Sequence, residues 1–210
     1  MLFKDYLVTG ALWLAWCVVH SLLNSEGPIR HTGILDTQIR RYYRFLYTVF
    51  AVASLLLVSW LTPRHHQMTI WTWYGPFKAI QVGLWIVGGI IAVLAFRFYS
   101  GWTFLGLDAF GLPRRRIRSE EVLITWGIYG SIRHPQFLAG LILLWSRNLN
   151  DTDLTINIVL SGYLLIGARI EERRLLRKWG DQYRRYMELT GRFIPKSMPG
   201  IASLFEGRPS

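Results

Sequence analysis

Three long apolar runs dominate the first half of the chain, at residues 6–23, 42–61 and 77–96. Each is close to the roughly 20 residues that an α-helix needs to cross a hydrocarbon core about 30 Å thick. We therefore predict three membrane helices. Aromatic residues flank the second and third runs, as expected where helices leave a bilayer. They are Trp60, Trp71, Trp73 and Tyr74.

The apolar signal is weaker beyond the third run. Residues 136–145 are apolar but few, residues 154–170 are nearly enough for a span, and a short polar turn separates them. Because backbone groups inside a bilayer must be hydrogen-bonded internally, the pattern favours a helical hairpin, either spanning or partly re-entrant. We expect an all-α polytopic integral membrane protein with about five membrane helices, a C-terminal helical hairpin and an amphipathic cytoplasmic tail.

Composition and charge limit the function. Hydrophobic residues make up 51% and charged residues 18% of the chain, and the net charge is +11. So apolar a composition excludes a nucleic-acid-binding protein, which the charge alone would suggest. With five spans, 20 of the 24 Lys and Arg residues fall on one side. The positive-inside rule then predicts an outside N-terminus and a cytoplasmic C-terminus, in the cell inner membrane if the cell is bacterial.

The fourth apolar run begins with an unusual trio, Arg133, His134 and Pro135. The N-terminus of a helix attracts anions, and proline suits the first helical turn because no backbone donor is wasted there. Two interpretations are open. The trio is either a positively charged helix start at the level of the lipid headgroups or part of a polar pocket for a charged ligand.

The last apolar run continues into a charged helix without a breaker until Gly180. Glu172 falls on a face with leucine and aromatic residues, whereas Glu171 falls beside it. That face carries Leu176, Trp179, Tyr183 and Tyr186. A carboxylate on such a face at a membrane boundary is costly unless it has a partner, which a ligand would supply. An ion pair between Glu171 and Arg174 is the alternative.

Two sets of motifs resemble known families. RHPQF, followed by EERRLLRKWGDQYRRY and then FIP, resembles the C-terminal signature of the isoprenylcysteine carboxyl methyltransferase and phospholipid methyltransferase superfamily. In the first half, HSLLNSEGPIR and RRYYRFLYTVF resemble NnrU-type membrane proteins and methanethiol S-methyltransferases. We expect a single membrane domain, with three spans in residues 1–97, a methyltransferase-like core in 98–196 and a tail in 197–210.

The resemblance implies an S-adenosylmethionine-dependent methyltransferase whose cofactor lies on the cytoplasmic side. His134 and the adjoining helix start would hold the cofactor carboxylate, the two glutamates its ammonium or ribose hydroxyls, and two tyrosines its adenine or sulfonium. The expected cofactor-binding residues are Tyr129, His134, Pro135, Glu171, Glu172 and Tyr183. Arg133, as a cation beside an anionic nucleophile, and His134, as a base for a thiol, are the expected catalytic residues.

The methyl acceptor is expected to be small or lipophilic, with a thiol, a carboxylate or a lipid amine as the reacting group. It would reach the pocket through the bilayer or its interface, so membrane lipids are the other expected partners. The alternative is an NnrU-like, non-catalytic membrane accessory protein, in which the same polar residues would be structural clamps.

Other residues support narrower hypotheses. His20 would either line a substrate entrance or make a structural hydrogen bond. We expect no metal site, because His65 and His66 have no carboxylate or cysteine nearby in the sequence. Glycines within the third run are expected to be helix-packing positions. They are Gly83, Gly88 and Gly89.

Overall fold

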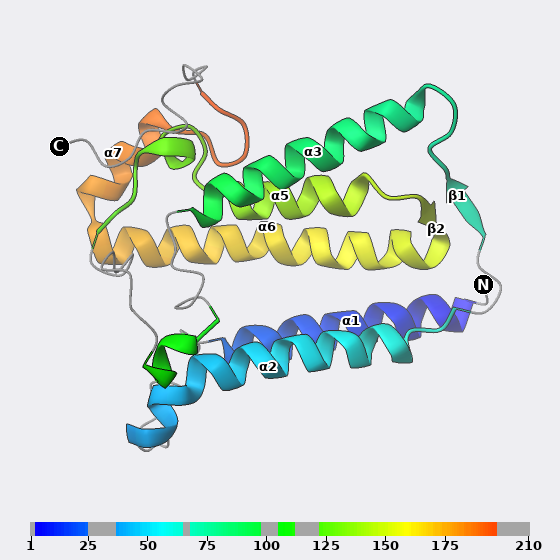
Figure 1. Ribbon diagram of the computed structural model, residues 1–210, viewed down its shortest axis with the longest axis horizontal. Helices are drawn as coiled ribbons and strands as arrows, with labels where there is room; N and C mark the ends of the chain where they lie inside the picture. Colours follow the sequence, from blue (N-terminus) through cyan, green and yellow to red (C-terminus); the bar gives the residue numbers. More distant parts are fainter. Residues whose placement is uncertain (1–2, 25–36, 65–67, 98–104, 112–121, 197–210) are drawn as a thin grey trace. The chain divides into compact units, whose positions relative to one another are not determined.

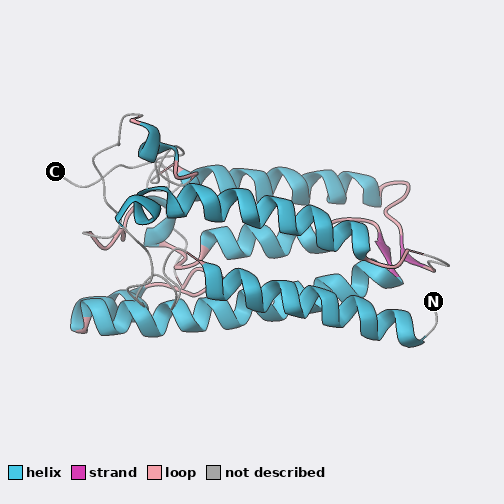
Figure 2. Cartoon of the chain, turned by 90° about the horizontal axis from the view of Figure 1, so that it is seen from below, coloured by secondary structure: helices cyan, strands magenta, loops and turns pink. Residues whose placement is uncertain are grey.

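The computed structural model describes residues 3–24, 37–64, 68–97, 105–111 and 122–196 (Figure 1). The His65–His66 pair and the expected tail at 197–210 lie outside these residues. Helix dominates the described part of the chain, with two short strands (Figure 2). The all-α class is confirmed.

Four of the described helices are long and apolar enough to cross a membrane. They are α1 (Phe3–Leu23), α2 (Thr37–Leu61), α3 (Phe77–Phe96) and α6 (Asp151–Trp179). The predicted hairpin is present as α5 (Pro135–Trp145) followed by α6, but α5 has only 11 residues. At 1.5 Å per residue α5 is about 16 Å long, which is about half of a hydrocarbon core.

Short elements complete the described structure. They are the strands β1 (Thr69–Trp71) and β2 (Leu149–Asn150), the 3₁₀ helices η2 (Leu107–Phe110) and η3 (Gly127–Gly130), and the helix α7 (Asp181–Leu189). The strands pair antiparallel, with Thr69 opposite Asn150. This pairing was not predicted, because a strand of two or three residues has too few positions to show an alternating pattern.

The described contacts divide the chain into two compact units. The first comprises Met1–Trp71, Ser100–Arg115 and Leu149–Leu160, and the second comprises Thr72–Tyr99, Arg116–Asn148 and Ser161–Ser210. Helix α6 contributes its first turns to the first unit and the remainder to the second. The organisation as one membrane domain stays a prediction.

In the first unit, side-chain hydrogen bonds join α1 to α2, which lie side by side (Figure 1). The bonds join Trp13 to Thr62 (2.9 Å), Trp16 to Ser54 (3.1 Å) and Tyr47 to His20 (2.8 Å). The His20 ring also stacks on Trp16, with ring centroids 4.8 Å apart. His20 is thus a hydrogen-bonded, packed side chain, as the structural interpretation expected.

In the second unit, α3 packs against α5 (Figure 1). Gly88 makes this approach possible, because a Cβ at that position would lie 3.1 Å from Leu143. The prediction of helix packing is confirmed for Gly88. For Gly83 and Gly89 it stays a prediction, because an added Cβ there would meet nothing within 4 Å in the described part of the chain. A repeat of glycines cannot show which one faces a neighbour, because successive positions point in different directions around a helix.

Candidate active site

The segment that contains Arg133 and His134 is held by backbone hydrogen bonds to a distant part of the chain. It follows η3, which begins at Gly127 in the left-handed conformation (φ 60°) that glycine adopts without steric cost. The Arg133 N–H donates to the Gly191 carbonyl (2.9 Å) and the His134 N–H donates to the Arg192 carbonyl (3.2 Å). The RHP stretch and the segment just before FIP, which lie at the two ends of the C-terminal signature, are therefore in contact.

Pro135 is the first residue of α5, and His134 occupies the N-cap position without a side-chain capping bond. The placement of proline at a helix start is confirmed. Since proline has no N–H and the Leu138 N–H already bonds to the His134 carbonyl (3.0 Å), the N–H groups of Gln136 and Phe137 are the ones left without an intrahelical acceptor.

Glu172 lies at the centre of an ion-pair network. Its side chain is 5% exposed, and its carboxylate accepts hydrogen bonds from Arg133 Nε (2.9 Å) and from the guanidinium of Arg192. The Arg133 guanidinium also donates to the backbone carbonyls of Met187 (3.2 Å) and Thr190. Arg133 thus ties α6 to the end of α7. Hydrogen bonding to Glu172 raises the pKa of Arg192, which keeps this pair charged.

Sequence reasoning missed Arg192. It lies 20 residues after Glu172, well beyond the i, i+3 and i, i+4 spacings that pair side chains within a helix. Its position depends on the turn that follows α7. The available signal was weak, namely its place directly before the FIP motif at residues 193–195.

His134 lies between the two glutamates. Its Nδ1 is 3.4 Å from Glu171 Oε2, and its Nε2 is 3.4 Å from Glu172 Oε1. The imidazole stacks on Phe137, with centroids 5.4 Å apart and planes 8° from parallel. The side chain is 3% exposed. The contact of Nε2 with Glu172 lacks hydrogen-bond geometry, so Nε2 is buried without a hydrogen-bond partner among the described residues.

Tyr183 also carries a buried polar atom without a partner. It is 1% exposed, and its hydroxyl makes no hydrogen bond to the described chain. Burial, reinforced by the negative charge of Glu172, raises the pKa of this phenol. Tyr183 therefore stays protonated at neutral pH and retains an O–H donor.

Tyr129 and Tyr186 have their hydroxyls engaged. The Tyr186 hydroxyl donates to the Tyr129 carbonyl (2.6 Å), and the Tyr129 hydroxyl donates to the Ala95 carbonyl (3.3 Å) and accepts a bond from Gln136. Tyr129 belongs to a hydrophobic cluster with Leu94. The structure thus brings Glu171, Glu172, Arg133 and His134 into contact, and it places Tyr129 in a packed core.

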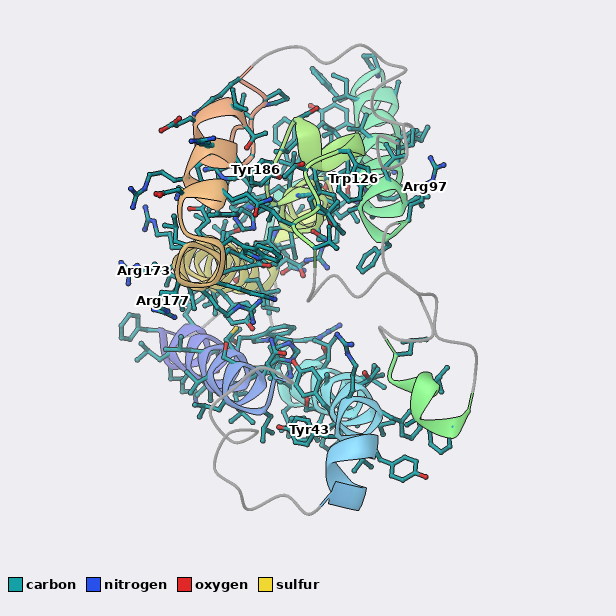
Figure 3. The ribbon with its side chains drawn as sticks, turned by 90° about the vertical axis from the view of Figure 1, so that its left-hand side faces the viewer. Tyr43, Arg97, Trp126, Arg173, Arg177 and Tyr186 are labelled. Atoms are coloured by element: carbon teal, nitrogen blue, oxygen red, sulfur yellow. The ribbon has the colours of Figure 1, made fainter. Side chains whose placement is uncertain are left out.

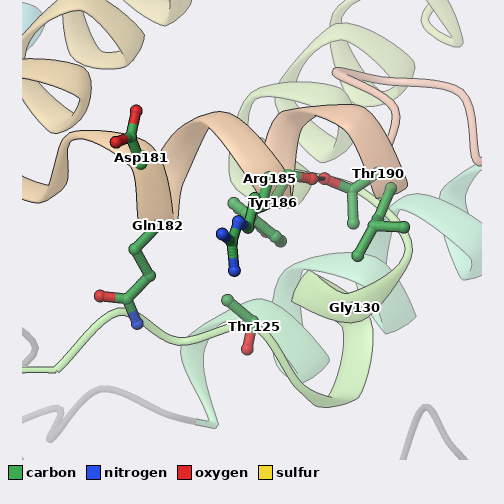
Figure 4. Close-up of a pocket in the computed structure, with 8 residues that line it drawn as sticks. Thr125, Gly130, Asp181, Gln182, Arg185, Tyr186 and Thr190 are labelled. Atoms are coloured by element: carbon green, nitrogen blue, oxygen red, sulfur yellow. Dashed lines mark hydrogen bonds between the residues drawn. The ribbon is translucent and has the colours of Figure 1, made fainter.

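Two cavities adjoin this cluster. The larger, of about 570 Å³, lies between η3 and α7 (Figure 4). It is lined by Thr125, Gly130, Asp181, Gln182, Arg185, Tyr186, Leu189 and Thr190. The smaller, of about 220 Å³, lies on one flank of Glu172. The side chains of Arg173 and Arg177 point outward from α6 near this flank, whereas Tyr186 points inward (Figure 3).

Proteins named methanethiol S-methyltransferase match most of the chain. One from a Pseudomonas species is 27% identical over 207 residues, which covers 89% of this chain and 76% of that protein. The chain resembles these enzymes. A protein with the same name from Mycobacterium tuberculosis is 26% identical (86% and 74% covered), and methanethiol S-methyltransferase 1 of Bradyrhizobium diazoefficiens is 28% identical (85% and 66%). No family model matches the chain, and no solved structure does.

The similarity to methanethiol S-methyltransferases extends over 85–89% of this chain in these three cases. It therefore includes at least part of the apolar first half and at least part of the region that forms the cluster. The matched proteins are named methanethiol S-methyltransferases, which is the resemblance noted for the motifs of the first half. The match therefore supports that resemblance more directly than the one noted for the C-terminal signature.

Proposed function

We propose that this protein is an integral membrane methyltransferase that uses S-adenosylmethionine and methylates a small or lipophilic thiol. The observation that carries the proposal is the pair of buried polar atoms, His134 Nε2 and Tyr183 Oη, that lack partners in the cluster shared with Glu171 and Glu172. Buried polar groups are normally hydrogen-bonded, so a ligand is expected to complete them. The printed name of the relatives supplies the reaction type.

The groups present fit the charges of the cofactor's amino-acid end. Glu171 is 38% exposed and has only the His134 contact at 3.4 Å among those described, so we assign it the ammonium or the ribose hydroxyls. The helix start at Pro135, with the two N–H groups that follow, suits the carboxylate. Tyr183 offers a hydroxyl donor and an aromatic ring, and a ring contact with a cation such as the sulfonium contributes about 0.5–2 kcal/mol.

Glu172 has a different role in this proposal. Because two arginines already bind its carboxylate, it is a positioning residue that fixes the Arg133–His134 segment against α6. Arg133 likewise directs its donors at Glu172 and two carbonyls. Arg133 would then contribute to the reaction through its positive charge beside the site, which favours an anionic acceptor.

The cofactor supplies the methyl group when bound, and the protein residues prepare the acceptor. We assign His134 Nε2 the role of taking the proton of a thiol, since it is buried and makes no hydrogen bond within the part of the chain that the structure describes. Thiolates are far better nucleophiles than thiols. Exclusion of water from so buried a cluster strengthens these electrostatic effects. The rest is alignment of the reacting atoms, which contributes on the order of 7–11 kcal/mol.

Calorimetry in detergent tests the cofactor assignment. We expect S-adenosylhomocysteine to bind the wild-type chain, and Glu171→Gln to weaken binding about tenfold or more, because a hydrogen bond to a charged group contributes about 1.5–3 kcal/mol. Arg177→Gln is the matched control, because Arg177 is exposed and lies on the outer face of α6. It should bind like the wild type.

Turnover gives a second readout. With S-adenosylmethionine and methanethiol, gas chromatography of the headspace should detect dimethyl sulfide. A well-folded chain that neither binds the cofactor nor forms this product would contradict the proposal and favour the accessory protein.

The orientation belongs to the same proposal. The charge asymmetry between the two sides supports a cytoplasmic position for the cluster and the C-terminus.

A further inference from the structure

The smaller cavity, on the flank of Glu172, is rich in arginine. It is lined by Arg169, Glu172, Arg173, Leu176, Met187 and Arg192. Neither His134 nor Glu171 lines it, so it lies apart from the contacts assigned above to the cofactor. Three of the six lining residues are arginines, and such a lining suits an anion.

The single carboxylate of this cavity does not neutralise it. Glu172 is already bound by Arg133 and Arg192. Arg169 and Arg173 make no ion pair with any residue in the described part of the chain. The cavity lining therefore holds three arginines and one carboxylate, and it keeps a positive charge that an anionic ligand would balance.

The neighbouring surface is apolar on the membrane side. Ile166 lies three residues before Arg169 and Ile170 lies three before Arg173 along α6, and the two isoleucines are 57% and 59% exposed. On a helical projection, Arg173 falls on the same face as these isoleucines. The apolar part of α6 ends here, as the chain passes into the run of arginines, which is where a membrane helix reaches the headgroups.

We propose that this cavity binds the phosphate group of an anionic phospholipid, with its acyl chains lying along Ile166 and Ile170. Guanidinium groups bind phosphate oxygens bidentately, which suits the three arginines of this lining. The cavity shares Glu172 and Arg192 with the ion-pair network, but it includes none of the residues assigned to the cofactor. Its test therefore does not depend on the proposed function.

Native mass spectrometry of the full chain in detergent tests this site. The probes are dioleoylphosphatidylglycerol, dioleoylphosphatidylcholine and inorganic phosphate. The cavity variant is Arg169→Gln with Arg173→Gln. The control variant, Arg177→Gln with Arg184→Gln, removes the same charge from exposed residues that do not line the cavity.

We expect phosphatidylglycerol to bind more tightly than phosphatidylcholine. The cavity variant should lose about tenfold or more in phosphatidylglycerol affinity, since each arginine near an anionic lipid contributes several-fold. The control should lose much less. If the cavity variant does not fold, Arg169→Lys with Arg173→Lys replaces it, and an intermediate loss is expected because lysine keeps the charge but not the bidentate geometry.

Three results would overturn the proposal. Equal losses in the cavity and control variants would show that diffuse surface charge attracts the lipid. Equal affinity for the two lipids would show that the phosphate site contributes nothing beyond apolar contact. Displacement of phosphatidylglycerol by millimolar inorganic phosphate would identify a site for a soluble anion instead.

Discussion

Replacement of Glu172 by glutamine tests the ion-pair network directly. The variant removes the charge that Arg133 and Arg192 share and presents an amide N–H₂ group to two cations. Removing one partner of a buried pair costs about 3–5 kcal/mol. The Arg192 side chain is 35% exposed and can turn to water, whereas Arg133 is 7% exposed and cannot. We therefore expect a loss near the lower end, about 3 kcal/mol.

Glu171→Gln is the matched control for this prediction. It makes the same chemical change one residue away, on a side chain that is 38% exposed and contacts only His134 at 3.4 Å among the described residues. Exposed ion pairs contribute about 0–1 kcal/mol, so its unfolding free energy should stay within 1 kcal/mol of the wild type. The assay is unfolding in mixed micelles by increasing dodecyl sulfate, followed by tryptophan fluorescence.

The two variants should differ in which property they lose, stability or cofactor affinity. Glu172→Gln should lose stability first and cofactor affinity as a consequence, whereas Glu171→Gln should lose cofactor affinity with its stability intact. The double variant Arg133→Gln with Glu172→Gln should cost less than the sum of its single variants, because either loss already breaks the pair. Equal stability of the two glutamine variants, or additive effects of Arg133 and Glu172, would refute the network.

Two further comparisons use neighbouring residues as controls. Gly88→Ala should destabilise the protein by about 1–3 kcal/mol through overpacking, because the added Cβ would lie 3.1 Å from Leu143. Gly89→Ala is the control, since an added Cβ there would meet nothing within 4 Å in the described chain. It should have little effect or stabilise α3. Tyr183→Phe should be neutral or stabilising without cofactor, because its hydroxyl is buried and unsatisfied. Tyr186→Phe should cost about 1 kcal/mol, because its hydroxyl donates to a backbone carbonyl; thermal unfolding measures all four.

The sequence predicts the helices well because a membrane span is a property of consecutive residues. The apolar runs at 42–61 and 77–96 appear as helices with the same C-terminal ends, and α6 continues without interruption to the residue before Gly180. Gly180 ends it with φ at 51°, a conformation that other residues rarely adopt. The face predicted to run along one helix from Glu172 to Tyr186 is therefore divided between α6 and α7. Glu172 and Tyr186, the first and last residues of that face, are nevertheless both buried.

The partners of the candidate site could be predicted only in part. The meeting of the Arg133–His134 segment with the two glutamates was expected from the resemblance, but the identity of the group that binds Glu172 was not. Sequence spacing cannot choose among many cations, and the choice of Arg133 and Arg192 depends on the turn after α7. Tyr129 was expected to flank the cofactor. The structure buries it against Leu94, and its contact with the cofactor stays a prediction.

The short length of α5 has a consequence for how the protein enters the membrane. An apolar segment of 11 residues is below the length at which a stretch is recognised as a span by itself. Helix α6, by contrast, is long and apolar enough. We therefore expect α5 to be inserted only together with α6, as a pair that forms after both have left the ribosome. A released chain truncated after Asn148 should accordingly leave the Arg133–His134 segment accessible to protease. The segment should become protected only in a chain that continues through Arg192, because the carbonyls of Gly191 and Arg192 bind it.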